Sequence, residues 1–207
     1  MYKRQSYGWI DGYCLCRNLR IPRLRQGERQ VSPSIEGIRA DHVNRYTWAV
    51  NHLPKGTVVD AACGIGYGSW VLANHGFYVR GIEIDPEAVE YGNTHYAHRN
   101  VYRQCKDLYD ANFGVDPVVM FECIEHVENP LPILEKCNGL LLASVPNEDV
   151  FPYKNYAFHY RHYTKTQFHD LLNRAGFKVD AWYGQEGPES EVEENVNGRT
   201  LIAVAHK

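Results

Sequence analysis

Hydrophobic positions along the chain follow two alternating periods from residue 38 onward. Short runs of consecutive apolar residues, typical of strands buried on both faces, alternate with stretches that have helical spacing. The apolar runs predict strands at 57–61, 78–84, 101–104, 117–122, 139–145, 177–183 and 200–205. The other stretches predict helices at 38–53, 69–75, 87–98, 130–137 and 165–175.

Local signals at the ends of these segments agree with the assignment. Asp85 is a helix N-cap, and Pro86 follows it at the first helical position. Thr164 and Gln167 have the spacing of a capping box, and Gly176 follows the helix that this box begins. Strands that alternate with helices predict a doubly wound α/β fold with a mostly parallel sheet. The last two strands have no helix between them, so we expect them to pair antiparallel.

Composition places the chain among ordinary globular proteins. Its 207 residues suit one domain, and 44% are hydrophobic and 23% charged. The net charge of -3 gives no bulk attraction to DNA, RNA or anionic membranes. No apolar run approaches the roughly 20 residues that span a bilayer. The cysteines have no paired CxxC spacing, which predicts free thiols and a cytoplasmic location; they are Cys14, Cys16, Cys63, Cys105, Cys123 and Cys137.

The first 36 residues differ from the rest of the chain. Between residues 6 and 36, five arginines stand against three acidic residues, and the hydrophobic pattern has no clear period. We expect a basic arm at 1–36, either flexible or substrate-binding, ahead of one domain at 37–207. Residues 1–5 match the translated end of a common sequencing-library adapter after a GTG start, so they are left out of the fold prediction.

Three features follow the first three predicted strands in order. The loop from Asp60 to Gly68 is rich in glycine, which lets the backbone turn sharply close to a ligand. Its spacing departs from the dinucleotide-binding pattern, because the third glycine position holds Ser69. Glu83 ends the second strand, where an acid accepts hydrogen bonds from a ribose diol. Asp107 follows the third strand, within reach of an adenine amino group.

These motifs together resemble those of a known family. The run VVDAACGIGYGSWVLANHGFYVRGIEIDPEAVEYG resembles the first motifs of class I S-adenosylmethionine (SAM) methyltransferases. The segments MFECIEHVENP, LLLASVPN and HYRHYTKTQFHDLLNRAGF resemble later motifs of the ubiquinone-pathway O-methyltransferases. The resemblance extends from Ile38 to the C-terminus, although the segment 128–140 is shorter than usual. It implies a Rossmann-like, seven-stranded sheet with an antiparallel last strand, and SAM as cofactor.

The resemblance also implies which residues contact the cofactor. Gly64 and Gly66 would pack on the methionine part, Glu83 would bind the ribose hydroxyls, and Asp107 with Leu108 would line the adenine. The complete implied set is Asp60, Ala62, Gly64, Gly66, Tyr67, Glu83, Ile84, Asp107, Leu108 and Glu122.

The end of the fourth strand carries candidate catalytic residues. Glu122, Glu125 and His126 place two carboxylates and an imidazole within five residues, which suits Mg²⁺ or another divalent cation. His159 is a fourth candidate ligand, and the set resembles the metal site of small-RNA terminal 2′-O-methyltransferases. The alternative is a site without metal, in which Glu122 caps the loop and His126, His159 or Glu125 acts in proton transfer or hydrogen bonding.

The acceptor remains open at this stage. The chain lacks the Pro-Cys motif of cytosine-C5 enzymes and the [DNS]-P-P-[FYW] motif of amino-methylating DNA enzymes. We expect O-methylation of a small molecule or glycan, with an RNA ribose 2′-O-methyltransferase or a non-catalytic SAM-binding protein as alternatives. His162 and His169 are expected at the surface. A cluster of aromatic residues forms either a lid or a small satellite core; its members are Phe151, Tyr153, Tyr156, Phe158, Tyr160 and Tyr163.

Overall fold

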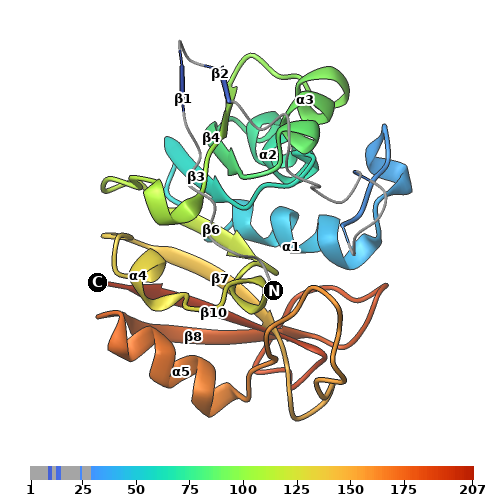
Figure 1. Ribbon diagram of the computed structural model, residues 1–207. Coiled ribbons are helices and arrows are strands. Elements are labelled where there is room, and N and C mark those ends of the chain that lie inside the picture. The colour runs from blue at the N-terminus through green and yellow to red at the C-terminus, as the bar shows by residue number, and fades with distance from the viewer. Residues whose placement is uncertain (1–8, 11–12, 15–23, 25–28) are drawn as a thin grey trace.

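The computed structural model describes residues 9–10, 13–14, 24 and 29–207. Residues 1–5, Cys16 and most of the basic arm therefore lie outside the described residues. Within the described part, eight strands form one sheet and two short strands form a separate hairpin (Figure 1). The hairpin consists of β1 (Trp9–Ile10) and β2 (Tyr13–Cys14). The sheet strands are β3 (Thr57–Ala61), β4 (Tyr78–Glu83), β5 (Val101–Cys105), β6 (Val118–Phe121), β7 (Leu141–Pro146), β8 (Lys178–Gln185), β9 (Glu193–Glu194) and β10 (Thr200–His206).

The helices lie on both faces of this sheet. Figure 1 shows α1, α2 and α3 gathered around β3 and β4, and α5 alongside β8. The α-helices are α1 (Ala40–Val50), α2 (Tyr67–Asn74), α3 (Pro86–His95), α4 (Leu131–Leu134) and α5 (Lys165–Arg174). Three short 3₁₀ turns are η1 (Ile35–Gly37), η2 (Leu108–Asp110) and η3 (Ile124–His126).

The strand order confirms the predicted fold. It runs β5-β4-β3-β6-β7-β10-β8-β9, with the first five strands parallel to one another. β10 pairs antiparallel with β8, as expected for strands joined without a helix, and it also pairs antiparallel with β7. The sheet has eight strands where seven were expected, because the two-residue β9 adds to β8. Its two glutamates carry no apolar signal, so the sequence pattern did not reveal it.

The predicted caps form as the sequence indicates. The Asp85 carboxylate accepts a 2.9 Å hydrogen bond from the Glu87 amide, at the start of α3. The Thr164 hydroxyl accepts from the Gln167 amide at 3.2 Å, and the Gln167 side chain accepts from the Thr164 amide at 2.9 Å. These bonds satisfy amides that have no partner inside their own helix.

Alternating residues on the central strands face two different cores. Val118 and Met120 of β6 pack in a cluster that includes residues of α5, whereas Val119 and Phe121 pack with residues of α1 and α2. Successive side chains of a strand point to opposite faces, so both faces of the central strands are buried. This explains the uninterrupted apolar runs in the sequence.

The described part of the basic arm lies on the domain. Leu24 and Val31 pack beside a small core that contains Ile38 and Ile65. The Tyr96 hydroxyl donates a 2.9 Å hydrogen bond to the carbonyl of Ser32. The arm therefore reaches the same side of the sheet as the glycine-rich loop. Within the described residues, no helix has the length and apolar character needed to cross a membrane.

Candidate functional site

The carboxyl end of β4 meets the glycine-rich loop at Glu83. The Gly64 amide donates a 2.9 Å hydrogen bond to one carboxylate oxygen of Glu83, and the Asp85 amide donates to the other at 3.0 Å. The Glu83 side chain is only 6% exposed. The structure thus brings together the loop and the acid that the sequence singled out separately.

Two glycines give this loop its shape. Gly64 and Gly66 have φ angles of +56° and +84°, which favour glycine. A Cβ on Gly66 would lie 2.3 Å from the Arg103 side chain, which would have to move to admit a larger residue. A Cβ on Gly64 would meet nothing closer than the Arg29 side chain, at 3.8 Å. Among the described residues, only the Arg29 side chain of the basic arm covers this position of Gly64 within 4 Å.

Asp60 supports the loop from inside the protein. Its fully buried carboxylate accepts hydrogen bonds from the Tyr46 hydroxyl at 2.9 Å and the Ser69 hydroxyl at 2.6 Å. Burial raises the pKa of Asp60 to about 6, although both hydrogen bonds oppose this change. The side chain of Asp60 links α1 and α2 under the loop, and its contact with a cofactor stays a prediction.

Strained backbone occurs at two neighbouring strand ends. Ala62 after β3 and Glu122 after β6 have φ angles of +58° and +48°, in the left-handed region that non-glycine residues seldom adopt. β3 and β6 pair directly in the sheet. Strain of this kind concentrates at functional sites, where the surrounding structure enforces it. Both positions belong to the predicted cofactor set.

The remaining predicted cofactor residues lie around the same sheet edge. Asp107 caps η2, accepting a 2.8 Å hydrogen bond from the Tyr109 amide, and Leu108 is buried next to it. Ile84 is 47% exposed. The Tyr67 hydroxyl lies 3.0 Å from Nδ1 of His42. The Tyr109 amide binds Oδ1 of Asp107, so we expect an adenine contact at Oδ2, and this contact remains a prediction.

Glu122 faces a buried arginine that the sequence gave no reason to select. Its carboxylate accepts a 2.8 Å hydrogen bond from the Ser144 hydroxyl and lies 3.2 Å from Nη1 of Arg45. Burial opposes ionisation of Glu122, but the Arg45 charge and the Ser144 bond outweigh it and lower its pKa. Arg45 comes from α1, and its side chain is only 1% exposed.

Three of the four predicted metal ligands come together. Within the described residues, Glu125, His126 and His159 form a group whose ligand atoms all lie within 4.8 Å of one another. The rings of His126 and His159 have centroids 4.6 Å apart. Glu122 lies outside this group, with Arg45 beside its carboxylate. Its charge still acts on the pKa of His159.

The protein fixes the orientation of the His126 ring. Its Nδ1 lies 2.9 Å from the carbonyl oxygen of Phe158. A carbonyl only accepts hydrogen bonds, so Nδ1 carries the proton and Nε2 of the neutral ring carries the lone pair. Nε2 lies 3.9 Å from Oε1 of Glu125.

His159 is also suited to act as a neutral base or ligand. Burial, together with the neighbouring His126 and His162, lowers the pKa of His159 to about 4, although the Glu122 charge opposes this. His162 is only 4% exposed, so its expected surface location was wrong. A buried aromatic setting accounts for this, because Phe151, Tyr153 and Tyr156 surround its ring. The His169 side chain, on α5, is 45% exposed.

Arg29 of the basic arm reaches the site across a long stretch of chain. Its guanidinium lies 2.6 Å from Asp85 and 3.3 Å from Glu83. Burial lowers the pKa of Arg29, but the two carboxylates outweigh it and raise the pKa overall. The excess of arginine in the arm was the available signal, yet it did not identify this residue.

Comparison with known proteins gives the class. A family model described as a methyltransferase domain matches residues 38–181, and the chain belongs to this family. A probable S-adenosylmethionine-dependent methyltransferase of Mycobacterium tuberculosis is 30% identical over 157 residues, which is 70% of this chain and 57% of that protein. A ubiquinone biosynthesis O-methyltransferase of Xanthomonas campestris is 36% identical over 121 residues, covering 56% of this chain and 49% of that protein. The match thus spans about half the length of these relatives.

Solved structures agree on the fold. Magnesium protoporphyrin IX methyltransferase from Synechocystis, with bound S-adenosylhomocysteine (SAH), has a TM-score of 0.63 at 20% identity, covering 87% of this chain and 90% of that one. A small RNA methyltransferase also has a TM-score of 0.63, at 19% identity, covering 81% of this chain and 26% of that one. At these identities the likeness establishes the Rossmann-like methyltransferase fold alone.

Proposed function

We propose that the protein is a SAM-dependent methyltransferase that O-methylates a small molecule or glycan with assistance from a divalent cation. The observation that carries this proposal is the group of Glu125, His126 and His159. Its first two members follow β6, and the glycine-rich loop and Glu83 lie at the carboxyl ends of the neighbouring parallel strands β3 and β4. The domain spans 37–207 behind the basic arm. A cytoplasmic location is consistent with the free thiols of Cys63, Cys105, Cys123 and Cys137 among the described residues.

The cofactor fits the first part of the site. The sharp turn at Gly64, with its φ of +56°, suits the methionine part, and Glu83 suits the ribose diol. One Glu83 oxygen accepts from both Asp85 N and Arg29. A ribose hydroxyl can replace the Arg29 contact at 3.3 Å, while the shorter contact of Arg29 with Asp85, at 2.6 Å, is retained.

We expect Glu83→Ala to weaken SAH binding by about 1.5–3 kcal/mol, roughly 10- to 150-fold in Kd. The reason is the loss of a charged acceptor for the ribose hydroxyls. Calorimetric titration with SAH measures the change. Glu90→Ala, an exposed acid on α3, is the matched control and should bind like the wild type. An unchanged Kd in a folded Glu83→Ala protein would remove Glu83 from the cofactor site.

The donor set fits a divalent cation. Glu125 supplies a buried carboxylate, and the Phe158 carbonyl enforces the His126 tautomer whose Nε2 can act as a ligand. A cation held by these residues would supply a positive charge that lowers the pKa of a substrate hydroxyl. A substrate with two adjacent hydroxyls, such as a catechol or a sugar, suits such a site. Without a cation, His126 or His159 would act as a general base.

We expect Mg²⁺ or Mn²⁺ to bind saturably to protein that is saturated with SAH. Glu125→Ala should abolish this binding because it removes the only carboxylate of the described three-residue group. Glu122→Gln is the informative comparison. The Glu122 carboxylate pairs with Arg45, so this substitution should weaken cation binding less than Glu125→Ala does. Isothermal calorimetry measures both. No saturable binding to the wild type would exclude metal assistance and leave a histidine as base.

RNA ribose 2′-O-methylation is the second candidate. The same three-residue group favours it, because a terminal ribose also presents adjacent hydroxyls. The net charge of -3 argues against an RNA partner. An assay of labelled methyl transfer distinguishes RNA from small-molecule acceptors. It compares RNA with an intact 3′ diol, RNA with an oxidised 3′ diol, catechols and sugars. SAM binding without transfer to any acceptor would favour a non-catalytic role.

A further inference from the structure

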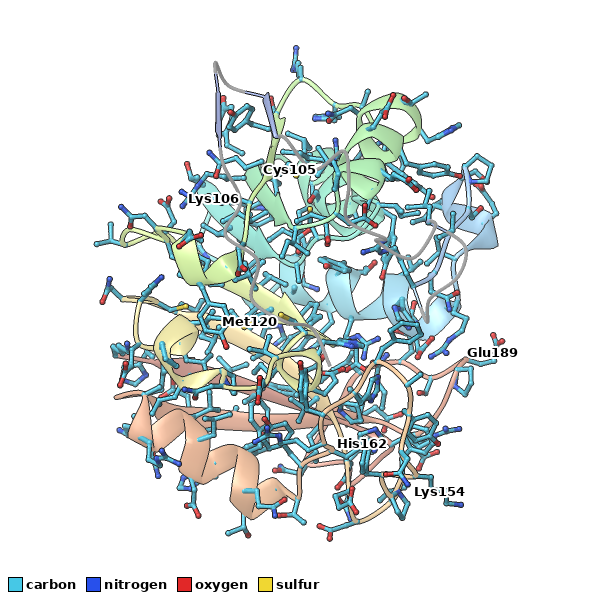
Figure 2. All side chains as sticks on the ribbon, in the orientation of Figure 1. Cys105, Lys106, Met120, Lys154, His162 and Glu189 are labelled. Carbon is cyan, nitrogen blue, oxygen red and sulfur yellow. The ribbon has the colours of Figure 1, made fainter. Side chains whose placement is uncertain are left out.

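His162 is a buried histidine that the proposed reaction does not use directly. It lies in the segment between β7 and α5 that also holds His159, and Figure 2 labels its side chain. Two of its contacts are polar. Nδ1 of His162 lies 2.6 Å from the carbonyl oxygen of Phe151, and Nε2 lies 2.8 Å from Nδ1 of His159.

These contacts determine where the protons are. The Phe151 carbonyl only accepts, so Nδ1 of His162 is the donor. Nε2 of the neutral His162 ring is then an acceptor, and Nδ1 of His159 must donate to it. The lone pair of His159 consequently lies on Nε2. One backbone carbonyl therefore sets the tautomer of His159 through the ring of His162.

Packing holds this relay in place. The His162 ring stacks on Tyr156, with centroids 5.3 Å apart and planes 15° apart. The ring centroids of Phe151 and Tyr153 lie 5.1 Å and 5.6 Å from that of His162. Tyr153 also donates a 3.0 Å hydrogen bond to the carbonyl of His159, which fixes the backbone of that residue. Three members of the aromatic cluster thus surround the His162 ring, whereas Tyr163 packs in the main core.

A backbone carbonyl also sets the tautomer of His126, the other histidine of the three-residue group. The Phe158 carbonyl sets the tautomer of His126 directly, and the Phe151 carbonyl sets that of His159 through His162. Both rings then carry the lone pair on Nε2. A second hydrogen bond of this kind orients a ligating histidine and raises its basicity.

We propose that His162 is a positioning residue, which holds His159 in the Nδ1–H tautomer and aims its Nε2 at the group formed with Glu125 and His126. The proposal deepens the proposed function and rests on it for the chemistry at His159. The tautomer itself does not depend on a metal or a substrate, so it can be tested separately.

The first test is the protonation pattern of the histidines in the wild-type protein without metal. Nitrogen-15 NMR of histidine-labelled protein distinguishes the two neutral tautomers. We expect the Nδ1–H form for His159 and for His162 near neutral pH. An Nε2–H form at His159 would overturn the proposal, whatever the outcome for metal binding.

Two variants test the consequence for binding. His162→Gln keeps an acceptor for His159 and a donor for Phe151, whereas His162→Leu removes both. We expect His162→Leu to weaken Mn²⁺ binding about 10- to 100-fold and to mix the His159 tautomers, and His162→Gln to stay within about threefold of the wild type. Equal Mn²⁺ affinity in the wild type and His162→Leu would overturn the proposal. If His162→Leu does not fold, the wild-type spectrum and the Mn²⁺ affinity of His162→Gln still test the proposal.

The outcomes separate this inference from the proposed function. Absence of Mn²⁺ binding to the wild type contradicts metal assistance, and the His159 tautomer then decides the positioning role alone. His169→Leu is the control histidine variant, because the His169 side chain is 45% exposed and lies outside the relay. It should leave the His159 signals and the Mn²⁺ affinity unchanged.

Discussion

Replacing His126 with alanine is expected to lower turnover about 100- to 10,000-fold without changing the affinity for SAH. Its Nδ1 is bound to the Phe158 carbonyl, so Nε2 remains to accept a proton or to ligate a cation. The side chain is 37% exposed, which leaves this nitrogen accessible to a substrate. SAH affinity should persist because Gly64 and Glu83 bind each other without His126.

Two measurements check this result. Turnover is measured with the best acceptor found in the methyl-transfer screen, and SAH affinity is measured by calorimetry. His169→Ala is the control, since it changes a partly exposed histidine on α5 outside the site. Full activity in His126→Ala would show that the catalytic assignment is wrong. Loss of SAH binding together with activity would instead indicate damage to the fold or to the cofactor site.

Replacing Phe168 with alanine is expected to lower the free energy of unfolding by about 3–5 kcal/mol. Phe168 is fully buried and packs against Tyr163 and Trp182, with ring centroids 6.1 Å and 5.8 Å away. The substitution removes the apolar surface that α5 places on the sheet and leaves a cavity that rigid neighbours cannot fill.

Urea unfolding followed by circular dichroism measures the loss. Tyr102→Ala is the control on β5, because that side chain is 65% exposed and its removal should change stability by about 0.5 kcal/mol or less. A loss below about 1 kcal/mol for Phe168→Ala would mean that the core under α5 rearranges to fill the space.

The sequence predicted most of the fold. Buried parallel strands require apolar residues on both faces, so β3, β6 and β7 stood out as continuous runs. Caps at Asp85 and Thr164 located the starts of α3 and α5, since their side chains bond to amides only two or three residues away. Interactions between residues so close in the sequence can be predicted from residue spacing alone. The two-residue β9 was missed because its pairing with β8 is set by the partner strand.

Part of the candidate site was likewise predictable from the sequence, and part was not. The glycine-rich loop, Glu83 and the group of Glu125, His126 and His159 were selected in advance, because motif spacing and strand ends indicate them. Only the tertiary structure showed Arg29 on Glu83, Arg45 beside Glu122, and His162 behind His159. Arg29 and Arg45 meet carboxylates far away in the sequence, and no periodicity encodes such pairs. The role of His162 depends on which ring nitrogen meets which atom, and that geometry exists only once the chain is folded.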